Sequence, residues 1–431
     1  MQFRSSLKQL WAESKANPVF TALYVGGVTL TVAFTMVAAI IFYVHIGPVY
    51  PEYNRATTAY IENVSVSNDN SMSMAGLGRP FATDFLDRSE NLEYYTLHSG
   101  ITPSYIQPAG GDDFHASVRY ADPAFFKLYA YEFVAGHPFT QADYDSGIRN
   151  VVVSDRIARR LYGSPDEAIG KTVSVDFKPN NIVGVVREGS PLCLDSYAQV
   201  IIPVMQPAGD PPRDRYRQYF GEYAATLKFK DKAQGEAFAA ELDEMMRRAT
   251  LADTAGYKLS HNLQTHSSKI LFSKDSGDDM LAALRPILLI LLVLLIIPAI
   301  NISGMIGGRM DRRVAEIGVR RSFGATRRAL TWQVMFENFT LTLVGGIIGL
   351  IVAWIVVIVC RQWILNLVLD SWDWENAGIT MGIDLTPEML LSPALFAVML
   401  VICLVLNMLS AYLPVRYSLR RPIVNSINQK R

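Results

Sequence analysis

The chain has 431 residues, half of them hydrophobic, and its mean hydropathy is positive. Forty lysines and arginines balance forty aspartates and glutamates, so the placement of charge is more informative than its sum. Four long apolar runs, each nearly free of charge, exclude a soluble enzyme rich in core leucines and predict a membrane protein with a large soluble part.

Residues 1–17 predict an amphipathic helix in the cytoplasmic interface of the membrane, with an ordinary N-terminal tail as the alternative. One side of this helix carries Phe3, Leu7, Leu10 and Trp11. Residues 19–44 predict the first membrane span. This run is too long for the apolar region of a signal peptide, and Pro48 and Pro51 follow it and end the helix.

Residues 48–279 form one long polar stretch whose aromatic residues, glycines and prolines are spread throughout, as in a folded domain. We expect a mixed α and β domain with an outer lobe at about 115–205 and a membrane-proximal lobe made from both flanks. The predicted strands are 117–120, 151–154, 172–177, 182–186 and 224–230, and the predicted helices are 154–162, with Ser154 as N-cap, and 232–249. A Pro-Asn-Asn turn at 179–181 is expected to join two of the strands.

Three further apolar runs predict the remaining spans at 286–307, 335–359 and 393–413. Pro298 predicts a kink in the second span because it removes a backbone hydrogen bond, and Asn301 is expected to face other helices. In the third span, Gly345, Gly346 and Gly349 are small residues that allow close helix packing. The connecting segments are a basic loop at 309–333, an acidic loop at 361–392 and a tail at 414–431.

The distribution of arginine and lysine predicts the orientation of the chain. The N-terminus, the basic loop and the tail are short and basic, which places both termini in the cytoplasm. The loop at 361–392 carries one arginine against five acidic residues and is expected outside. The large polar domain then lies between the first and second spans, outside the cytoplasm. No internal repeat is visible, so the arrangement is one helix plus three.

The loop at 309–333 is the stretch with the strongest functional signal. It carries seven arginines against two acidic residues, with apolar side chains between them. Gly324, Ala325 and Thr326 predict a helix break followed by a new N-cap. We therefore expect a short helix that a cytoplasmic partner grips, in addition to a charged anchor.

Residue patterns typical of enzymes are weak in this chain. Gly170-Lys171-Thr172 resembles the end of a phosphate-binding loop, but Pro165 occupies the position where the motif requires a glycine. The six histidines are scattered and are expected to be solvated or capping residues, and no Cys/His cluster has metal-ligand spacing. No serine lies in a Gly-x-Ser-x-Gly motif. We expect no catalytic residue, metal or cofactor, and we expect lipid or protein, not nucleic acid, at the basic loop.

Several motifs resemble those of one family. Near the basic loop, the residues similar to the MacB/FtsX-like permeases of ABC transporters are Glu316-Ile-Gly-Val-Arg-Arg-Ser-Phe-Gly-Ala-Thr326, Gln333-x-x-x-Glu337 and Leu343-Val-Gly-Gly-Ile-Ile-Gly349. The residues of the polar domain that resemble the periplasmic core domain of that family include Asp122-Pro-Ala-Phe-Phe126, Val151-Val-Val-Ser154, Ala158-Arg-Arg-Leu-Tyr-Gly163 and Ile182-Val-Gly-Val-Val186. The resemblance covers nearly the whole chain.

The resemblance implies a membrane subunit that works with separate ATPases. Two permease chains, identical or paralogous, would bind two copies of a cytoplasmic ABC ATPase through a coupling helix at about Val319–Thr331. Closure of the ATPases on ATP would then move the outer domains, which is called mechanotransmission. The implied contact and hinge residues are Glu316, Gly318, Arg320, Arg321, Phe323, Gly324, Ala325 and Thr326. The alternative is that these arginines only anchor lipid and fix the topology.

The implied function is export or extraction of a substrate on the outer side of the bacterial inner membrane, with a periplasmic adaptor as a further partner. The chain shows no Walker motif and begins close to the first span, so ATP is expected to bind to a partner subunit. Pro48, Pro51 and Pro286 interrupt the helical continuation that a tall stalk requires. Two alternatives stay open: an FtsX-like signalling scaffold that activates a cell-wall hydrolase, and a membrane-anchored enzyme, for which no clustered catalytic set is visible. The substrate is left open.

Overall fold

The structure, a computed structural model, describes residues 17–68, 71–108, 111–191, 193–204, 217–251, 257–271, 322–360 and 393–420, together with residues 15, 289, 293, 319 and 320. The chain divides into two compact units. One, the helical unit, comprises residues 1–43, 281–361 and 387–431, and the other, the α/β unit, comprises 44–280 and 362–386. Most of the predicted N-terminal helix, nearly all of the second span, the acidic loop and the end of the tail lie outside the described residues.

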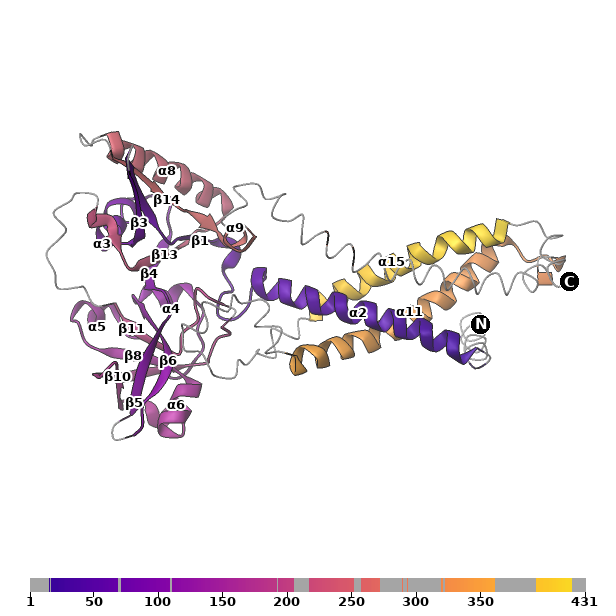
Figure 1. Ribbon diagram of the computed structural model, residues 1–431, viewed down its shortest axis with the longest axis horizontal. Helices are drawn as coiled ribbons and strands as arrows, with labels where there is room; N and C mark the ends of the chain where they lie inside the picture. Colours follow the sequence, from indigo (N-terminus) through magenta and orange to yellow (C-terminus); the bar gives the residue numbers. More distant parts are fainter. Residues whose placement is uncertain are drawn as a thin grey trace. The chain divides into compact units, whose positions relative to one another are not determined.

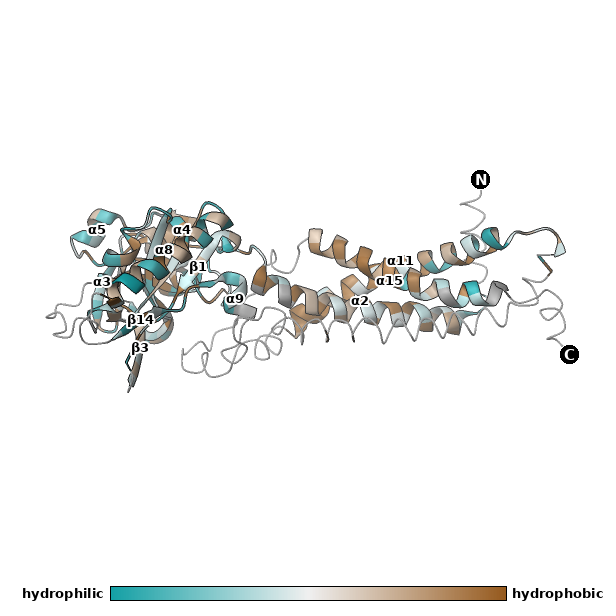
Figure 2. Cartoon of the chain, turned by 90° about the horizontal axis from the view of Figure 1, so that it is seen from above, coloured by the Kyte–Doolittle hydropathy of each residue, from teal (hydrophilic) through white to brown (hydrophobic). Residues whose placement is uncertain are grey.

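The described part of the helical unit contains three long apolar helices, α2 (Pro18–Ile46), α11 (Arg327–Val359) and α15 (Pro393–Arg420), and the last residues of α2, from Val44, belong to the α/β unit. By length and composition each of them contains a segment that can cross a membrane. Large apolar side chains remain exposed along all three, as on Phe34, Ile355 and Leu409, and Figure 2 shows the helices as predominantly hydrophobic. Helices that expose apolar surface on their outer faces suit a lipid environment.

The α/β unit is built on fifteen strands among its described residues, with helices around them (Figure 1). Its first strands are β1 (Thr58–Ile61), β2 (Val64–Asn68), β3 (Ser71–Leu77), β4 (Tyr94–Ser99), β5 (Thr102–Pro108), β6 (Phe114–Ala121) and β7 (Phe133–Gly136). The later strands are β8 (Asn150–Ser154), β9 (Thr172–Val175), β10 (Lys178–Val186), β11 (Val200–Pro203), β12 (Phe220–Gly221), β13 (Tyr223–Lys228), β14 (Lys258–His261) and β15 (Gln264–Thr265). The helices are α3 (Arg79–Phe81), α4 (Ala124–Leu128), α5 (Gln141–Asp145), α6 (Asp155–Tyr162), α7 (Pro165–Ala168), α8 (Lys232–Leu251) and α9 (His266–Leu271).

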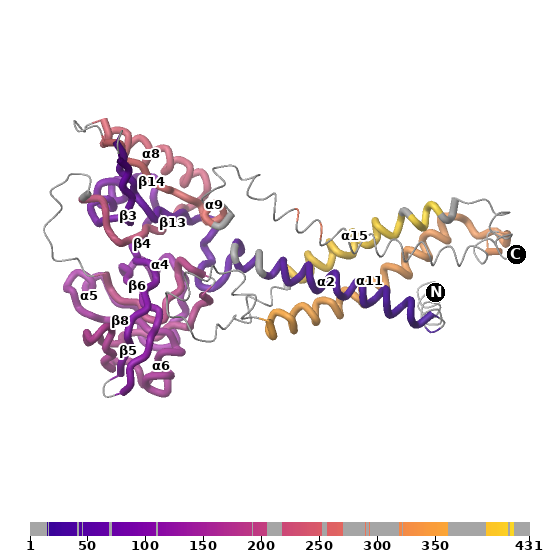
Figure 3. The backbone as a smooth tube through the Cα atoms, viewed as in Figure 1, coloured from indigo at the N-terminus to yellow at the C-terminus, as the bar shows by residue number. Residues whose placement is uncertain are grey.

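These elements form two lobes with separate hydrophobic cores. The central lobe, residues 102–203, packs the apolar side chains of β5, β6 and β8–β11 together with α6, and a second cluster gathers around Phe125, Tyr129 and Phe139. The flanking lobe, residues 58–99 and 217–271, packs α8 through Phe238, Leu242 and Met246 against its strands. Figure 3 shows the chain leaving the flanking lobe after β4, and it is back in that lobe before β13.

The six main strands of the central lobe close into a ring. Their order is β11-β8-β10-β9-β5-β6, and β11 also pairs in parallel with β6. Closure removes the free edges of a sheet, so the backbone of each strand finds partners on both sides. The lobe predicted for about 115–205 therefore also includes β5, because β5 pairs with both β6 and β9.

The two lobes meet where β4 pairs with β6, at a register in which His98 lies opposite Ala121. On its other side β4 pairs with β13 over six residues, from Tyr223 opposite Ser99 to Lys228 opposite Tyr94. The end of β4 is therefore the place where the hydrogen-bonded sheet passes from one lobe to the other.

Several local predictions for the α/β unit are confirmed, and one is wrong. Ser154 caps α6 by accepting a hydrogen bond from the amide of Ile157, as expected. The Pro-Asn-Asn turn at 179–181 is wrong, because those residues lie within β10, opposite β9. The hairpin instead turns at Asp176 and Phe177, both with positive φ, and the Asp176 carboxylate accepts a hydrogen bond from the amide of Tyr105. Two residues with positive φ match the twist of a tight hairpin.

Candidate functional site

The turn before α11 is the part of the basic loop that the structure describes best. Gly324 has φ +93°, and the amide of Ala325 donates to the carbonyl of Arg320 at 3.0 Å. A left-handed residue with this six-to-one hydrogen bond is a Schellman ending of a helix. Thr326 then caps α11 by accepting a hydrogen bond from the amide of Ala329 at 3.2 Å. The predicted helix break and new cap are confirmed here.

The coupling helix is expected at about Val319–Thr331, and the structure shows where this segment is interrupted. The break at Gly324 divides it, because the left-handed conformation cannot continue a helix. Residues 327–331 belong to α11, which runs without interruption from Arg327 to Val359. The part of the loop next to the turn is therefore continuous with a helix of membrane-spanning length.

Two aromatic side chains beside this turn project into solvent. Phe323 is 88% exposed and Trp332 is 74% exposed, and Arg327 and Arg328 are also exposed. Large exposed apolar side chains in a basic setting mark a surface that contacts a protein or a membrane. Behind them, the guanidinium of Arg320 donates to the side-chain oxygen of Gln333 at 3.2 Å, which ties the turn to α11.

Of the residues predicted for ATPase coupling, the structure brings together Arg320, Phe323, Gly324, Ala325 and Thr326. Glu316, Gly318 and Arg321 lie outside the described residues, as do Pro298 and Asn301 of the second span. The sequence did not single out Trp332. Its signal was available, because Trp332 lies four residues after the arginine pair at 327 and 328, and a tryptophan within a basic loop is a frequent anchor at interfaces.

The three glycines of α11 lie against two different helices. A methyl group at Gly345 would lie 2.9 Å from Cβ of Val28, and one at Gly349 would lie 2.7 Å from the carbonyl oxygen of Thr29. Both contacts are with α2. A methyl group at Gly346 would instead lie 2.7 Å from Cδ1 of Leu400 on α15. The glycines therefore allow α11 to pack closely with a neighbour on each side.

Polar side chains reinforce the seam between α2 and α11. The hydroxyls of Tyr24 and Thr342 lie 3.0 Å apart, and the Thr29 hydroxyl donates to the carbonyl of Gly345 at 3.1 Å. Hydrogen bonds between helices within apolar surroundings fix their relative rotation as well as adding attraction. The sequence does not mark these residues, because single threonines and tyrosines within apolar runs carry no distinctive pattern.

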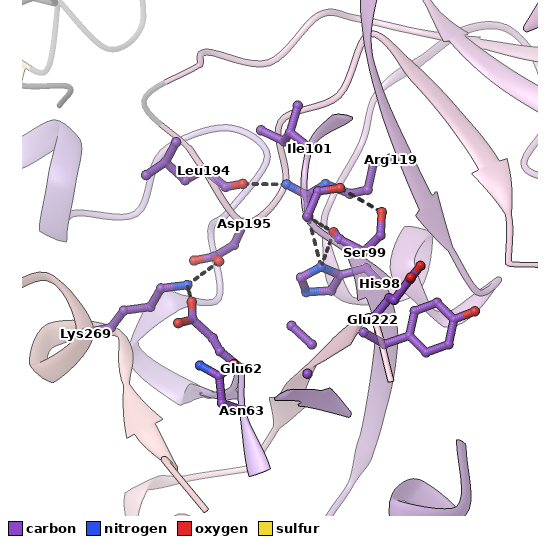
Figure 4. Close-up of a pocket in the computed structure, with 14 residues that line it drawn as sticks. Glu62, Asn63, His98, Ser99, Ile101, Arg119, Leu194, Asp195, Glu222 and Lys269 are labelled. Carbon is purple, nitrogen blue, oxygen red and sulfur yellow. Dashed lines mark hydrogen bonds and ion pairs between the residues drawn. The ribbon is translucent and has the colours of Figure 1, made fainter. Parts of the chain in front are cut away.

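A cavity of about 510 Å³ lies where the two lobes of the α/β unit meet (Figure 4). The residues lining it come from the β1–β2 loop, β3, the end of β4, β6, the loop at 193–197, β12–β13 and α9. Its charged and titratable lining residues are Glu62, His98, Arg119, Asp195, Glu222 and Lys269. A cavity of this size with a few convergent polar groups is typical of a ligand pocket or of a gap between movable parts.

His98 and Arg119 form a buried polar pair at one wall of this cavity. Arg119 donates to Nδ1 of His98 at 2.9 Å and to the carbonyls of Ser99 and Leu194, each at 2.6 Å. Because a guanidinium only donates, Nδ1 of His98 must accept, and its Nε2–H then donates to the hydroxyl of Thr226 at 2.8 Å. Burial, together with the charge of Arg119, lowers the pKa of His98 to about 3, so the imidazole is neutral.

Lys269 lies at the opposite wall of the cavity. Its ammonium group forms ion pairs with Asp195 and, at 2.6 Å, with Glu62. Burial acts to raise the pKa of Asp195, but the nearby positive charges, with Lys269 foremost, outweigh it and lower the pKa overall. Asp195 is therefore ionised, and the lysine is shared between carboxylates that come from different segments of the chain (Figure 4).

The sequence did not predict this cavity, because its charged residues are separated by up to 207 positions, from Glu62 to Lys269. The expectation that the histidines are solvated or capping residues is wrong for His98, which is buried within β4, and His266 is also buried, at the start of α9. No local motif marks them, since the pairing of β4 with β6 and β13 brings His98 inside, and His266 lies against Tyr60 of β1. Within the described ranges, no group of three His, Cys, Asp or Glu side chains has metal-binding geometry.

Comparison with known proteins identifies two family regions. The model of the MacB-like periplasmic core domain matches residues 21–245, and the model of the FtsX-like permease C-terminal region matches residues 288–423. The macrolide export ATP-binding/permease protein MacB 1 of Yersinia pestis bv. Antiqua is 21% identical over 382 residues, which cover 85% of this chain and 54% of that protein. YknZ of Bacillus subtilis, an uncharacterized ABC transporter permease, is 21% identical over 237 residues, which cover 54% of this chain and 55% of YknZ. The chain thus spans about half the length of the curated relatives it matches.

Two solved structures are similar to part of the chain. The periplasmic region of MacB from Actinobacillus actinomycetemcomitans has 15% identity and a TM-score of 0.34, covering 48% of this chain and 91% of that one. The extracellular domain of YknZ from Gram-positive bacteria has 14% identity and a TM-score of 0.30, covering 46% and 99%. The family models together span both units of the chain, and the core-domain model alone covers more than half of its 431 residues. The chain therefore belongs to the MacB/FtsX family of ABC transporter permeases, with a MacB-like periplasmic core domain and an FtsX-like C-terminal region.

Proposed function

We propose that this chain is the membrane subunit of an ABC-type exporter, driven by ATPase subunits that are separate polypeptides. Two permease chains and two ATPase subunits make up the complex. ATP binding and hydrolysis move the turn before α11, and the helices carry the movement to the α/β unit outside the cytoplasm. Substrate is expelled or extracted on the outer side by this change of shape.

The observation that carries the proposal is the exposed turn at Gly324–Thr326. A Schellman ending and a new N-cap hold a rigid corner in which Phe323 and Trp332 are exposed among arginines. Leaving two large aromatic rings in water is unfavourable unless a partner covers them. An ATPase with an apolar groove and an acidic rim fits this surface, because the groove takes the rings and the rim pairs with Arg327 and Arg328.

The packing of α11 supports a mechanical role for the corner. Leu330 and Ala325 pack into the same cluster as Tyr24 and Val28 of α2, so the corner and the neighbouring helix share one core. Close-packed contacts transmit displacement because interiors have little free volume. A push on Phe323 is thus passed to α2, and α2 continues directly into the α/β unit.

The two family models match the periplasmic core domain and the FtsX-like permease region of the chain. The basic loop and tail, with the positive-inside rule, support cytoplasmic termini in the bacterial inner membrane. This orientation is tested by labelling intact cells with a membrane-impermeant maleimide in a Phe323→Cys variant in which Cys360 and Cys403 are replaced by alanine. Phe323→Cys should stay unlabelled until the membrane is permeabilised, and labelling in intact cells would contradict the orientation.

The test of the coupling surface uses matched aromatic changes. Phe323→Asp, and separately Arg320→Glu with Arg321→Glu, should abolish co-purification of the ATPase from detergent-solubilised membranes. Phe177→Asp serves as the control, because Phe177 is also exposed, at 76%, but belongs to the α/β unit. Retention of the ATPase by the Phe323 and arginine variants at the level of the Phe177 control would refute the proposed surface.

A further inference from the structure

Both ends of the α/β unit converge on one short loop, residues 193–197, which we name the junction loop. The loop is a compact turn in which the amides of Ser196 and Tyr197 donate to the carbonyl of Cys193. It is anchored to the central lobe by Arg119, which donates to the carbonyls of Leu194, at 2.6 Å, and Tyr197, at 3.2 Å. Two of its residues, Leu194 and Asp195, line the cavity between the lobes.

The incoming segment reaches the junction loop through two buried charges. The guanidinium of Arg55 donates to the carbonyls of Val44, in the last turn of α2, and Gly47, at 2.6 and 2.8 Å. It also pairs with the carboxylate of Glu52 at 2.8 Å. Glu52 in turn accepts hydrogen bonds from the amide and the hydroxyl of Ser196, at 3.0 and 2.7 Å. A continuous series of charge-assisted hydrogen bonds, through Arg55 and Glu52, thus connects the end of α2 with the junction loop.

The outgoing segment reaches the same loop through α9. Lys269 pairs with Asp195 of the junction loop and with Glu62 of the flanking lobe, and it lies 4.6 Å from the ring centroid of Tyr60. His266, at the start of α9, lies 3.1 Å from the Tyr60 hydroxyl. Beyond α9 the chain continues toward the stretch at 286–307 that the sequence predicts as the second span.

These contacts link the junction loop to both the end of α2 and α9. Ion pairs and charge-assisted hydrogen bonds depend steeply on distance in a buried setting, so they resist separation of the groups they join. Glu52 and Arg55 are both almost fully buried, and the Lys269 ammonium bridges two segments at the cavity wall. A displacement of α2 or of α9 must therefore either carry the loop with it or break these contacts.

We infer that the junction loop is the point at which movements of the first and second spans reach the cavity between the lobes, and that Lys269 is a positioning residue that couples α9 to both lobes. The inference rests on the proposed function, since it assigns a route to the movement that the ATPase drives. Displacement of α9 moves both Asp195 and Glu62 in the same direction, because Lys269 is paired with both carboxylates. The cavity lies between these attachments, and it opens or narrows as the lobes rotate about the pairing of β4 with β6.

The experiment measures the distance between the lobes in the complete complex. Spin labels are placed at Arg159→Cys on α6 and Glu236→Cys on α8, two exposed positions on helices of different lobes. Cys360 and Cys403 are replaced by alanine, and the buried Cys193 is kept. Double electron–electron resonance is recorded with and without a non-hydrolysable ATP analogue. The unaltered complex should show a nucleotide-dependent change in the distance distribution.

Lys269→Met should reduce this change to less than half, while ATPase co-purification and basal ATP hydrolysis stay as in the parent. Lys269→Arg, which keeps the charge and both carboxylate partners, should preserve most of the change, and Lys178→Met, at an exposed lysine of β10, is the matched control. Should Lys269→Met fail to fold, Asp195→Asn takes its place, because it removes one ion pair at nearly constant shape.

The outcomes separate the two levels of the proposal. A full nucleotide-dependent change in Lys269→Met or Asp195→Asn overturns the role of the junction loop and leaves the proposed function intact. A distance distribution that is insensitive to nucleotide in the parent complex overturns the route through the cavity. Absence of a bound ATPase in the parent overturns the proposed function itself and this inference with it.

Discussion

Protonation of His98 should destabilise the α/β unit, and the substitution His98→Gln should remove this destabilisation. The ring is buried, accepts a hydrogen bond from Arg119 and donates one to Thr226. A second proton on Nδ1 would lie against the guanidinium, and Arg119 would lose Nδ1 as an acceptor, although the Ser99 carbonyl lies 3.2 Å from Nδ1. His98→Gln keeps one acceptor and one donor at this position but cannot titrate, so it should retain the network while abolishing the dependence on pH.

The magnitude follows from the pKa of His98, which burial and the charge of Arg119 lower to about 3 in the folded chain, against about 6.5 in an unfolded one. Because the unfolded state binds the proton more tightly, the His98 contribution to stability is complete above pH 6.5 and is lost as the pH falls toward 3. From pH 7 to pH 5 the free energy of unfolding should fall by about 2 kcal/mol. Burial raises the pKa of Asp122 to about 6, so the titration of this carboxyl changes the free energy of unfolding in the opposite direction. This contribution is the same in the parent and in His98→Gln.

Hydrogen exchange followed by mass spectrometry on the complete chain in nanodiscs measures this difference. Peptides that cover β4 and β13 report the opening free energy at pH 7 and pH 5 once the intrinsic exchange rates are corrected. The parent should lose about 2 kcal/mol more than His98→Gln between the two values. Equal losses in the two proteins would show that His98 titrates normally and that the neutral pair with Arg119 is mistaken.

Three further predictions concern single positions. Gly349→Leu should lower the melting temperature of the detergent-solubilised chain, since overpacking against Thr29 costs about 1–3 kcal/mol, whereas Gly26→Leu, where no neighbouring atom lies within 4 Å, should leave it unchanged. Thr326→Ala should cost about 1 kcal/mol of helix stability and speed amide exchange in the first turn of α11, and Thr326→Asp should not, because aspartate also caps. Cys193 should resist iodoacetamide at pH 8 until the chain is denatured, because burial raises the pKa of its thiol. Rapid labelling of Cys193 itself in the native chain would disprove this.

The parts of the fold that local rules determine could be predicted from the sequence. The break at Gly324 and the cap at Thr326 follow from residue types that end and begin helices, whatever the tertiary context. The cap of α6 at Ser154 follows in the same way. The hairpin turn at Asp176 and Phe177 could not be predicted as easily, because phenylalanine rarely adopts positive φ and Pro179 suggested a turn elsewhere.

The site in the α/β unit depends on long-range pairing, which a single sequence does not reveal. Arg119 and His98 are 21 residues apart, and Lys269 lies 74 residues beyond Asp195. Each of these residues has an ordinary polar neighbourhood in the sequence, and none belongs to a motif. The coupling surface was more accessible to prediction, because its arginines, glycine and threonine are contiguous in the chain.

The two units show different ways of joining elements, and the difference has a physical reason. In the helical unit α11 contacts its neighbours at glycines and through hydrogen bonds between uncharged side chains, and Glu337 is a buried acidic residue of the same helix. In the α/β unit the ends of the domain are joined by buried ions such as Arg55, Glu52 and Lys269. Replacing such ions by apolar residues often does not weaken a fold, so their presence is poorly explained by stability alone. Ion pairs do impose distance and direction, which is the property that a link between moving segments requires.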